Sequence, residues 1–242
     1  MISFLMASLV GLSLGLLGSG GSILAVPVLK YTAGLSAKQA VATSLATVGS
    51  VSLVGALLAW REGRVAWREA SLFSVVATVG TYGGVQIAHR LSDATLMGIF
   101  VAVMVYAVVR MLREKKSTDE ATGTAGAVGK ALGVGILTGV VGVGGGFLIV
   151  PALVALFHLP MKKATGTSLV VISINSLVGT LSYSSEVPLD WLFTAKFVAA
   201  AVLGLLLGMR WAQQMSEGKL QRVFAVLLAV VCIYMGVREF LM

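Results

Sequence analysis

The chain has 242 residues, of which 57% are hydrophobic and 12% are charged, and its mean hydropathy is +0.96. Soluble domains carry about 25% charged residues, so this composition excludes an ordinary soluble protein and indicates an all-α, polytopic membrane protein. The net charge of +8 does not indicate nucleic-acid binding, because the basic residues lie in short stretches between apolar runs, as orienting loops do. The single cysteine, Cys232, excludes an intrachain disulfide.

Eight apolar segments follow one another along the chain, most of them near the ~20 residues that a spanning helix needs. They cover residues 2–29, 39–60, 69–88, 94–112, 131–157, 165–184, 192–213 and 220–241. The first and the fifth are longer, and each is interrupted by a glycine cluster that a proline follows. The stretch 113–130 is rich in charged and small residues, so we expect a polar linker between two transmembrane domains, 1–112 and 131–242.

The two domains repeat each other at a constant offset of 124 positions, which pairs Pro27 with Pro151. Over positions 11–67 roughly two residues in five are identical to their counterparts, which is far more than shared apolarity produces. The identical pairs include Gly18 with Gly142, Gly20 with Gly144, Gly21 with Gly145, Lys38 with Lys162, Thr43 with Thr167, Ser44 with Ser168 and Trp67 with Trp191. Two such halves are typical of secondary transporters, whose substrate lies near the midplane where broken segments of both halves meet.

The distribution of Lys and Arg favours inverted halves over parallel ones. If all eight segments cross the membrane, the basic residues divide ten to eight between the two sides, which gives no bias. If the first and fifth segments turn back at their glycine clusters, the division becomes thirteen to five. Each arm of ~14 residues would then reach about 21 Å, which passes the midplane of a ~30 Å hydrocarbon core.

The two glycine clusters are the first candidate for a functional site. They read Gly18-Ser19-Gly20-Gly21-Ser22 and Gly142-Val143-Gly144-Gly145-Gly146. Hydrocarbon tolerates irregular backbone only where it is buried in protein or lines a cavity. A half-helix that begins after such a cluster points N–H groups and the positive end of its dipole at the break, which suits an anion. Tight helix packing through small residues is the structural alternative.

Polar residues in the second segment of each half form the second candidate. The pairs Thr43-Ser44 and Thr167-Ser168 occupy equivalent positions, and their hydroxyls could face an anion or could cap a helix and bond a neighbouring one. Asn175 is the amide well inside a segment, and it could donate to substrate or to another helix. Small-residue patches at 80–84 and 204–208 could serve packing within the chain or a homodimer.

Several kinds of chemistry have no motif in this sequence. No Asp or Glu lies in the middle of a segment, so a relay of buried carboxylates has no candidate residues. The zinc motif His-Glu-x-x-His and a Walker loop are both missing. We therefore expect neither an enzyme nor an ATP-driven pump, and no cofactor or metal.

The duplicated pattern Gly-x-Gly-Gly-[Ser/Gly]-x-x-x-x-Pro, followed by Ala-x-x-Thr-Ser-Leu, resembles the sulfite exporter TauE/SafE family over essentially the whole chain. The resemblance implies a bacterial or archaeal inner-membrane transporter of small sulfur-containing anions such as sulfite, sulfonates or sulfoacetate. It implies substrate contacts at Gly18, Gly20, Gly21, Ser22, Thr43, Ser44, Gly142, Gly144, Gly145, Gly146, Thr167 and Ser168. Because Ser22 stands where the second half has Gly146, the two half-sites should differ.

We expect alternating access, in which the two glycine-rich breaks face each other and neutral donors replace the hydration shell of the anion. To the substrate contacts that the resemblance implies we add Ser19 and Asn175, because their hydroxyl and amide groups can donate to an anion. An anion channel and a non-transporting membrane partner protein are the alternatives. The expected partners are the anionic substrate, the lipid bilayer and a second copy of the chain, with no nucleic acid.

Overall fold

The computed structural model of the chain describes residues 2–92, 146–157, 159–184 and 187–216, with single residues or short runs within 95–136 and 218–233. Outside these lie the predicted linker 113–130 and most of the predicted segments 94–112 and 220–241 and of residues 131–145. Every regular element in the described residues is a helix, which confirms the all-α class. The helices are α1 (Ile2–Leu17), α2 (Gly20–Thr32), α3 (Ala37–Arg61), α4 (Trp67–His89), α7 (Gly146–Phe157), α8 (Met161–Ser184) and α9 (Trp191–Gln214).

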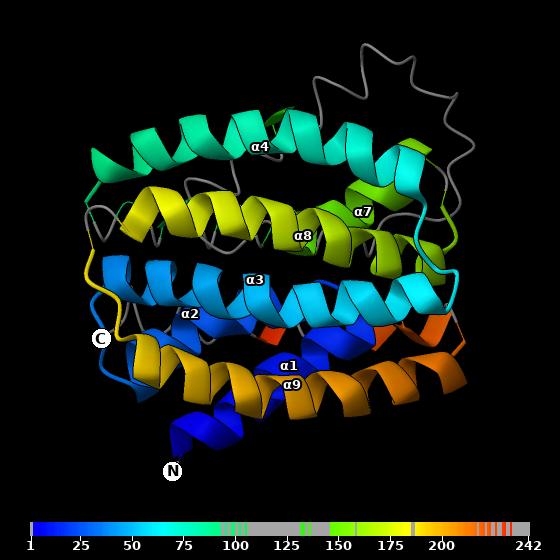
Figure 1. The fold of residues 1–242 in the computed structure, drawn as a ribbon, viewed down its shortest axis with the longest axis horizontal. Coiled ribbons are helices and arrows are strands. Elements are labelled where there is room, and N and C mark those ends of the chain that lie inside the picture. The colour runs from blue at the N-terminus through cyan, green and yellow to red at the C-terminus, as the bar shows by residue number, and fades with distance from the viewer. Residues whose placement is uncertain are drawn as a thin grey trace.

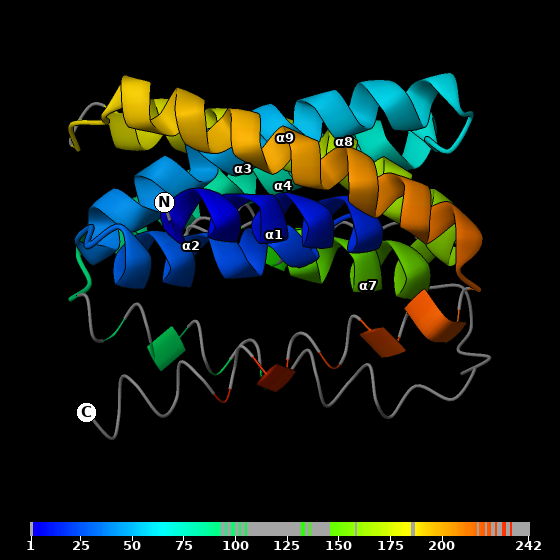
Figure 2. The ribbon, with the colours of Figure 1, turned by 90° about the horizontal axis from the view of Figure 1, so that it is seen from below.

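Four long helices lie side by side in one layer, in the order α4, α8, α3 and α9 (Figure 1). The shorter helices α1, α2 and α7 form a second layer against it (Figure 2). Of the described helices, α3, α8 and α9 are long and apolar enough to cross a membrane. At 1.5 Å per residue each exceeds the ~30 Å thickness of a hydrocarbon core, as a membrane protein requires.

Local signals start the long helices where the apolar segments begin. Ser36 caps α3, since its hydroxyl accepts a hydrogen bond from the Gln39 amide while the Gln39 side chain accepts one from the Ser36 amide. Asp190 caps α9 with a single bond, which its carboxylate accepts from the Phe193 amide over 2.9 Å. Such caps satisfy amides that the first helical turn leaves without partners.

Helices α1 and α2 form an antiparallel hairpin that covers the first predicted segment, 2–29, and extends to Thr32. Near its open end, the Ser3 hydroxyl donates to the Thr32 carbonyl over 3.3 Å. Nearer the turn, Gly21 packs directly on the backbone of Val10, where a side chain would have no room. Gly18 makes the turn with φ of +70°, a conformation that favours glycine. The chain thus turns back at the first glycine cluster.

Helix α3 packs antiparallel to α8, and its contacts come in reciprocal pairs. A Cβ on Gly55 would lie 3.1 Å from Leu169, and a Cβ on Gly179 would lie 3.1 Å from Leu45. Each residue of the first contact is 124 positions from a residue of the second, which is the offset of the sequence repeat. The starts and ends of α2, α3 and α4 likewise precede those of α7, α8 and α9 by 123 to 126 positions.

Helix α1 packs on α9 through glycines. Gly204 and Gly208 of α9 contact the carbonyl oxygens of Ser8 and Leu12, and Gly11 of α1 contacts that of Ala201. These backbones approach so closely that no side chain fits between them, which is how small residues serve membrane bundles. The small-residue patch at 204–208 therefore packs within the chain.

Candidate functional site

The tip of the α1–α2 hairpin rests on the first turns of α8. A Cβ atom on Gly18 would lie 2.6 Å from the Cβ of Thr165, and the Ser168 hydroxyl lies 3.1 Å from the Gly18 carbonyl oxygen. The same hydroxyl lies 2.7 Å from the Thr165 carbonyl, so the two acceptors share its proton. Thr165 is about 6 Å along the axis from the start of α8, so the tip lies nearer to that end than to the middle.

The N-terminus of α2 lies buried at this tip. Ser19 stands at the N-cap position and is fully buried, but its side chain caps no amide of the helix. Within the described part of the chain its hydroxyl has no hydrogen-bond partner. The Ser22 hydroxyl donates instead to the Ser19 carbonyl over 2.7 Å. A helix N-terminus carries a partial positive charge. The tip therefore places the Ser19 hydroxyl, which has no partner among the described residues, beside the positive end of the α2 dipole.

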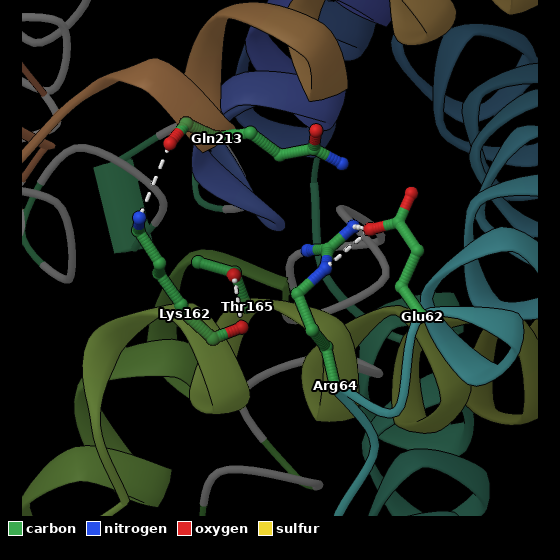
Figure 3. Close-up of polar contacts among 5 residues, drawn as sticks. All are labelled: Glu62, Arg64, Lys162, Thr165 and Gln213. Atoms are coloured by element: carbon green, nitrogen blue, oxygen red, sulfur yellow. Dashed lines mark hydrogen bonds and ion pairs between the residues drawn. The ribbon is translucent and has the colours of Figure 1, made fainter.

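Two basic side chains, those of Lys162 and Arg64, lie near Thr165 at the end of the bundle that the tip approaches (Figure 3). There the Lys162 ammonium donates to the Gln213 carbonyl over 3.2 Å, and Arg64 forms an ion pair with Glu62. Because α3 and α9 end here while α4 and α8 begin here, this end gathers Arg61, Arg64, Arg68, Lys162, Lys163 and Arg210. We call it the basic end. The opposite end holds Lys30, Lys38, Arg90 and Lys196.

The two Thr-Ser pairs do not meet. Since α3 and α8 are antiparallel, Ser44 and Ser168 lie about 18 Å apart along the helix axes. Ser168 reaches the hairpin tip, whereas the Ser44 hydroxyl bonds the Val41 carbonyl of its own helix over 2.8 Å. The Thr167 hydroxyl accepts a bond of 3.0 Å from the Ala66 amide, which anchors the loop between α3 and α4. Thr43 is buried in α3.

The second glycine cluster lies mostly outside the described residues. Gly142, Gly144 and Gly145 are not among them, and Gly146 is the first residue of α7. The structure therefore describes the surroundings of one cluster, at the α1–α2 tip, where Gly20 begins α2 and Gly21 packs on α1.

Asn175 lies near the middle of α8 and is fully buried. Its Oδ1 accepts a hydrogen bond of 3.0 Å from the Thr78 hydroxyl of α4, but its Nδ2 has no partner in the described residues. One turn before Thr78, the hydroxyl of Ser74 is also buried and, over the same ranges, without a partner. Ser74 and Thr78 are not among the site residues predicted from the sequence. Comparing each polar residue with its repeat counterpart would have found them, because both counterparts are valines, Val198 and Val202.

The donors at both places are neutral. No cluster of three or more His, Cys, Asp or Glu that could hold a metal occurs among the residues the structure describes. Hydroxyls, an amide and a helix N-terminus can replace part of the hydration shell of an anion, but they provide no nucleophile and base in contact. The arrangement therefore suits recognition rather than bond chemistry.

Comparison with known proteins agrees with this interpretation. The family model described as "Sulfite exporter TauE/SafE" matches residues 3–235. A probable membrane transporter protein of Xylella fastidiosa strain 9a5c is 35% identical over 236 residues, which cover 93% of this chain and 90% of the relative. YdhB of Bacillus subtilis strain 168, also a probable membrane transporter protein, is 25% identical over 90% of this chain and 92% of its own. No solved structure matches.

Proposed function

The chain belongs to the sulfite exporter TauE/SafE family of membrane transporters, which are not enzymes, and we propose that it carries a small sulfur-containing anion of the sulfite, sulfonate or sulfoacetate type. The proposed location is the bacterial or archaeal inner membrane, which the chain crosses several times. The family description names sulfite, and the other two anions share its sulfur–oxygen acceptors.

The observation that carries the proposal is the buried N-terminus of α2 beside the Ser19 hydroxyl. A buried hydroxyl without a partner costs free energy, and hydrocarbon provides no water to relieve that cost. An anion oxygen would accept from the hydroxyl and would also interact favourably with the helix dipole. The basic end would attract anions toward the tip from one side of the membrane.

The second part of the proposal is that two inverted halves give alternating access. Antiparallel packing of α3 on α8, with its reciprocal Gly55–Leu169 and Leu45–Gly179 contacts, supports halves related by an axis in the membrane plane. The concentration of Lys and Arg at one end supports placing that end in the cytoplasm.

Uptake of radiolabelled sulfite into proteoliposomes tests the proposal, with sulfonates, thiosulfate, sulfate and chloride as competitors. We expect saturable uptake that a sulfonate inhibits, together with accelerated exchange against internal substrate, which a channel would not show.

Ser19→Ala should raise the KM for sulfite about tenfold. Ser13→Ala is the matched control, because that buried hydroxyl bonds only the Val10 carbonyl of its own helix among the described contacts. Equal KM in both variants would contradict the site.

A further inference from the structure

The contact between α4 and α8 carries a polar cluster that the other half of the repeat does not have. Asn175 and Thr78 bond each other, and Ser74 lies buried one helical turn before Thr78 on α4; we call these three residues the amide cluster. The residues 124 positions away are Val198, Val202 and Val51, so each polar residue has a valine as its counterpart. These valines belong to α9 and α3, which also pack on each other. The chain thus has one polar and one apolar version of the same helix contact.

Helix packing accounts for the Thr78 hydroxyl and for Asn175 Oδ1, but not for the other two hydrogen-bonding groups of this cluster. The Thr78 hydroxyl donates to Asn175 Oδ1 over 3.0 Å and so links α4 to α8. That bond fixes the amide so that Nδ2 presents its two protons elsewhere. Within the described ranges, Asn175 Nδ2 and the Ser74 hydroxyl bond nothing, although both residues are at least 96% buried. Three valines would hold the helices together without leaving such donors unsatisfied.

The amide cluster lies deeper than the hairpin tip on the same face of α8. Asn175 follows Ser168 by seven residues, which is two turns and about 10 Å, and Ser168 bonds the tip at Gly18. The next residue, Ser176, lies against Gly49 near the middle of α3. An anion that left the tip along this face of α8 would therefore reach the Asn175 amide near the centre of the bundle.

No charged side chain accompanies the amide cluster on the helices that form it. Between Ala70 and Ala88 of α4, and between Ala164 and Ser184 of α8, the sequence has no Asp, Glu, Lys or Arg. The cost of removing an ion from water rises steeply with its charge. Neutral donors can offset that cost for a single negative charge far better than for two.

We infer that the amide cluster is a second substrate contact, in which Asn175 Nδ2 and the Ser74 hydroxyl donate to an oxygen of a monovalent oxyanion. Thr78 is a positioning residue that acts through its bond to Asn175. The inference rests on the proposed function and narrows its substrate to singly charged forms, such as a sulfonate or hydrogensulfite. The amide cluster discriminates against a doubly charged oxyanion such as sulfate, because its neutral donors offset too little of the cost of dehydrating two charges.

The test measures uptake of methanesulfonate and of sulfate by proteoliposomes that hold the full-length protein. The unaltered protein should carry methanesulfonate and discriminate against sulfate at equal concentration. Ser74→Ala should raise KM for methanesulfonate about tenfold without lowering the thermal midpoint, because its hydroxyl has no partner in the described chain. Asn175→Val should raise KM further. Thr78→Val should raise KM, and Thr78→Ser should restore it.

Matched controls come from the counterpart positions. Val198→Ala and Val202→Ala should leave KM within about twofold, since these side chains offer no donor. If Ser74→Ala and Asn175→Val keep the unaltered KM while the protein transports normally, this inference is wrong and the proposed function stands. Equal transport of sulfate and methanesulfonate would also overturn it. If the unaltered protein moves no oxyanion, the proposed function fails and this inference fails with it.

Discussion

Gly18 meets Thr165 so closely that a Cβ on the glycine would lie 2.6 Å from the threonine Cβ and 2.7 Å from its Cα. The hairpin tip therefore packs on the backbone of α8. A larger residue at position 18 would meet the Thr165 backbone, which cannot move aside as a flexible side chain could. The φ of +70° at Gly18 adds a second reason for glycine. The close packing of Gly18 on Thr165 and the positive φ of Gly18 together determine where α2 begins.

Gly18→Ala should destabilise the protein and abolish transport. Left-handed backbone costs about 1–2 kcal/mol for a residue other than glycine, and overpacking against α8 adds roughly 1–3 kcal/mol. Gly34→Ala separates the two effects, because Gly34 has φ of +71° but no heavy atom within 4 Å of an added Cβ. Thermal midpoints in detergent should fall for both variants, and clearly further for Gly18→Ala. Equal decreases would show that the seating on α8 is unimportant.

Ser168→Ala should weaken the attachment of the tip. The variant loses the hydroxyl that lies between the Gly18 and Thr165 carbonyls, which should lower the free energy of unfolding by about 1 kcal/mol and reduce the rate of sulfite uptake. Ser173→Ala is its control, because that hydroxyl bonds the Val170 carbonyl of the same helix. Transport by Ser173→Ala should be unchanged. Full activity in Ser168→Ala would mean that the tip does not depend on this bond.

The hairpin could be predicted from the sequence because its cause is local. The glycine cluster interrupts the apolar helix at Gly18, while Pro27 lies inside α2, and the distribution of Lys and Arg indicated that the segment turns back. The α1–α2 hairpin has that geometry, with Ser3 beside Thr32. The long helices of the two halves also begin at positions related by the repeat offset, since Ala37 and Trp67 precede Met161 and Trp191 by 124 positions.

The roles of single hydroxyls could not be predicted, because they depend on contacts between distant parts of the chain. Thr167 and Ser168 are adjacent in sequence, yet Thr167 accepts from the Ala66 amide and Ser168 reaches Gly18. Their directions follow from how α8 is rotated against its neighbours, which no local pattern encodes. Asn175 depends in the same way on Thr78, 97 positions earlier.

Thr167→Val should affect stability rather than substrate affinity. The variant leaves the Ala66 amide without its partner at 3.0 Å, which should cost about 1–2 kcal/mol. Thr167→Ser keeps the hydroxyl and should restore the thermal midpoint. Sulfite uptake by the folded fraction should show an unchanged KM in both variants. A raised KM in Thr167→Val alone would instead place this hydroxyl on the substrate pathway, as the sequence analysis allowed.

Labelling of single cysteines tests the inverted arrangement. In a Cys232→Ala background, Ser216→Cys follows α9 at the basic end, and Ala33→Cys follows α2 at the opposite end. A membrane-impermeant maleimide added to intact cells should label Ala33→Cys and spare Ser216→Cys, because basic loops remain cytoplasmic. Labelling of both from outside, or of Ser216→Cys alone, would contradict the orientation proposed here.

Lys162→Gln should slow the capture of anions from the basic end. The Lys162 ammonium has a carbonyl partner, that of Gln213, and in the described residues no carboxylate pairs with it, whereas Arg64 is already paired with Glu62. Its charge is therefore available to attract an anion, and its loss should lower initial uptake from that side roughly threefold at low ionic strength. At high salt the difference should shrink, because exposed charges are then screened.

Lys38→Gln is the control: at the counterpart position on the opposite end, it should leave uptake from the basic end unchanged. A loss that persists at high salt would mean that Lys162 acts through its bond to α9 and not through its charge.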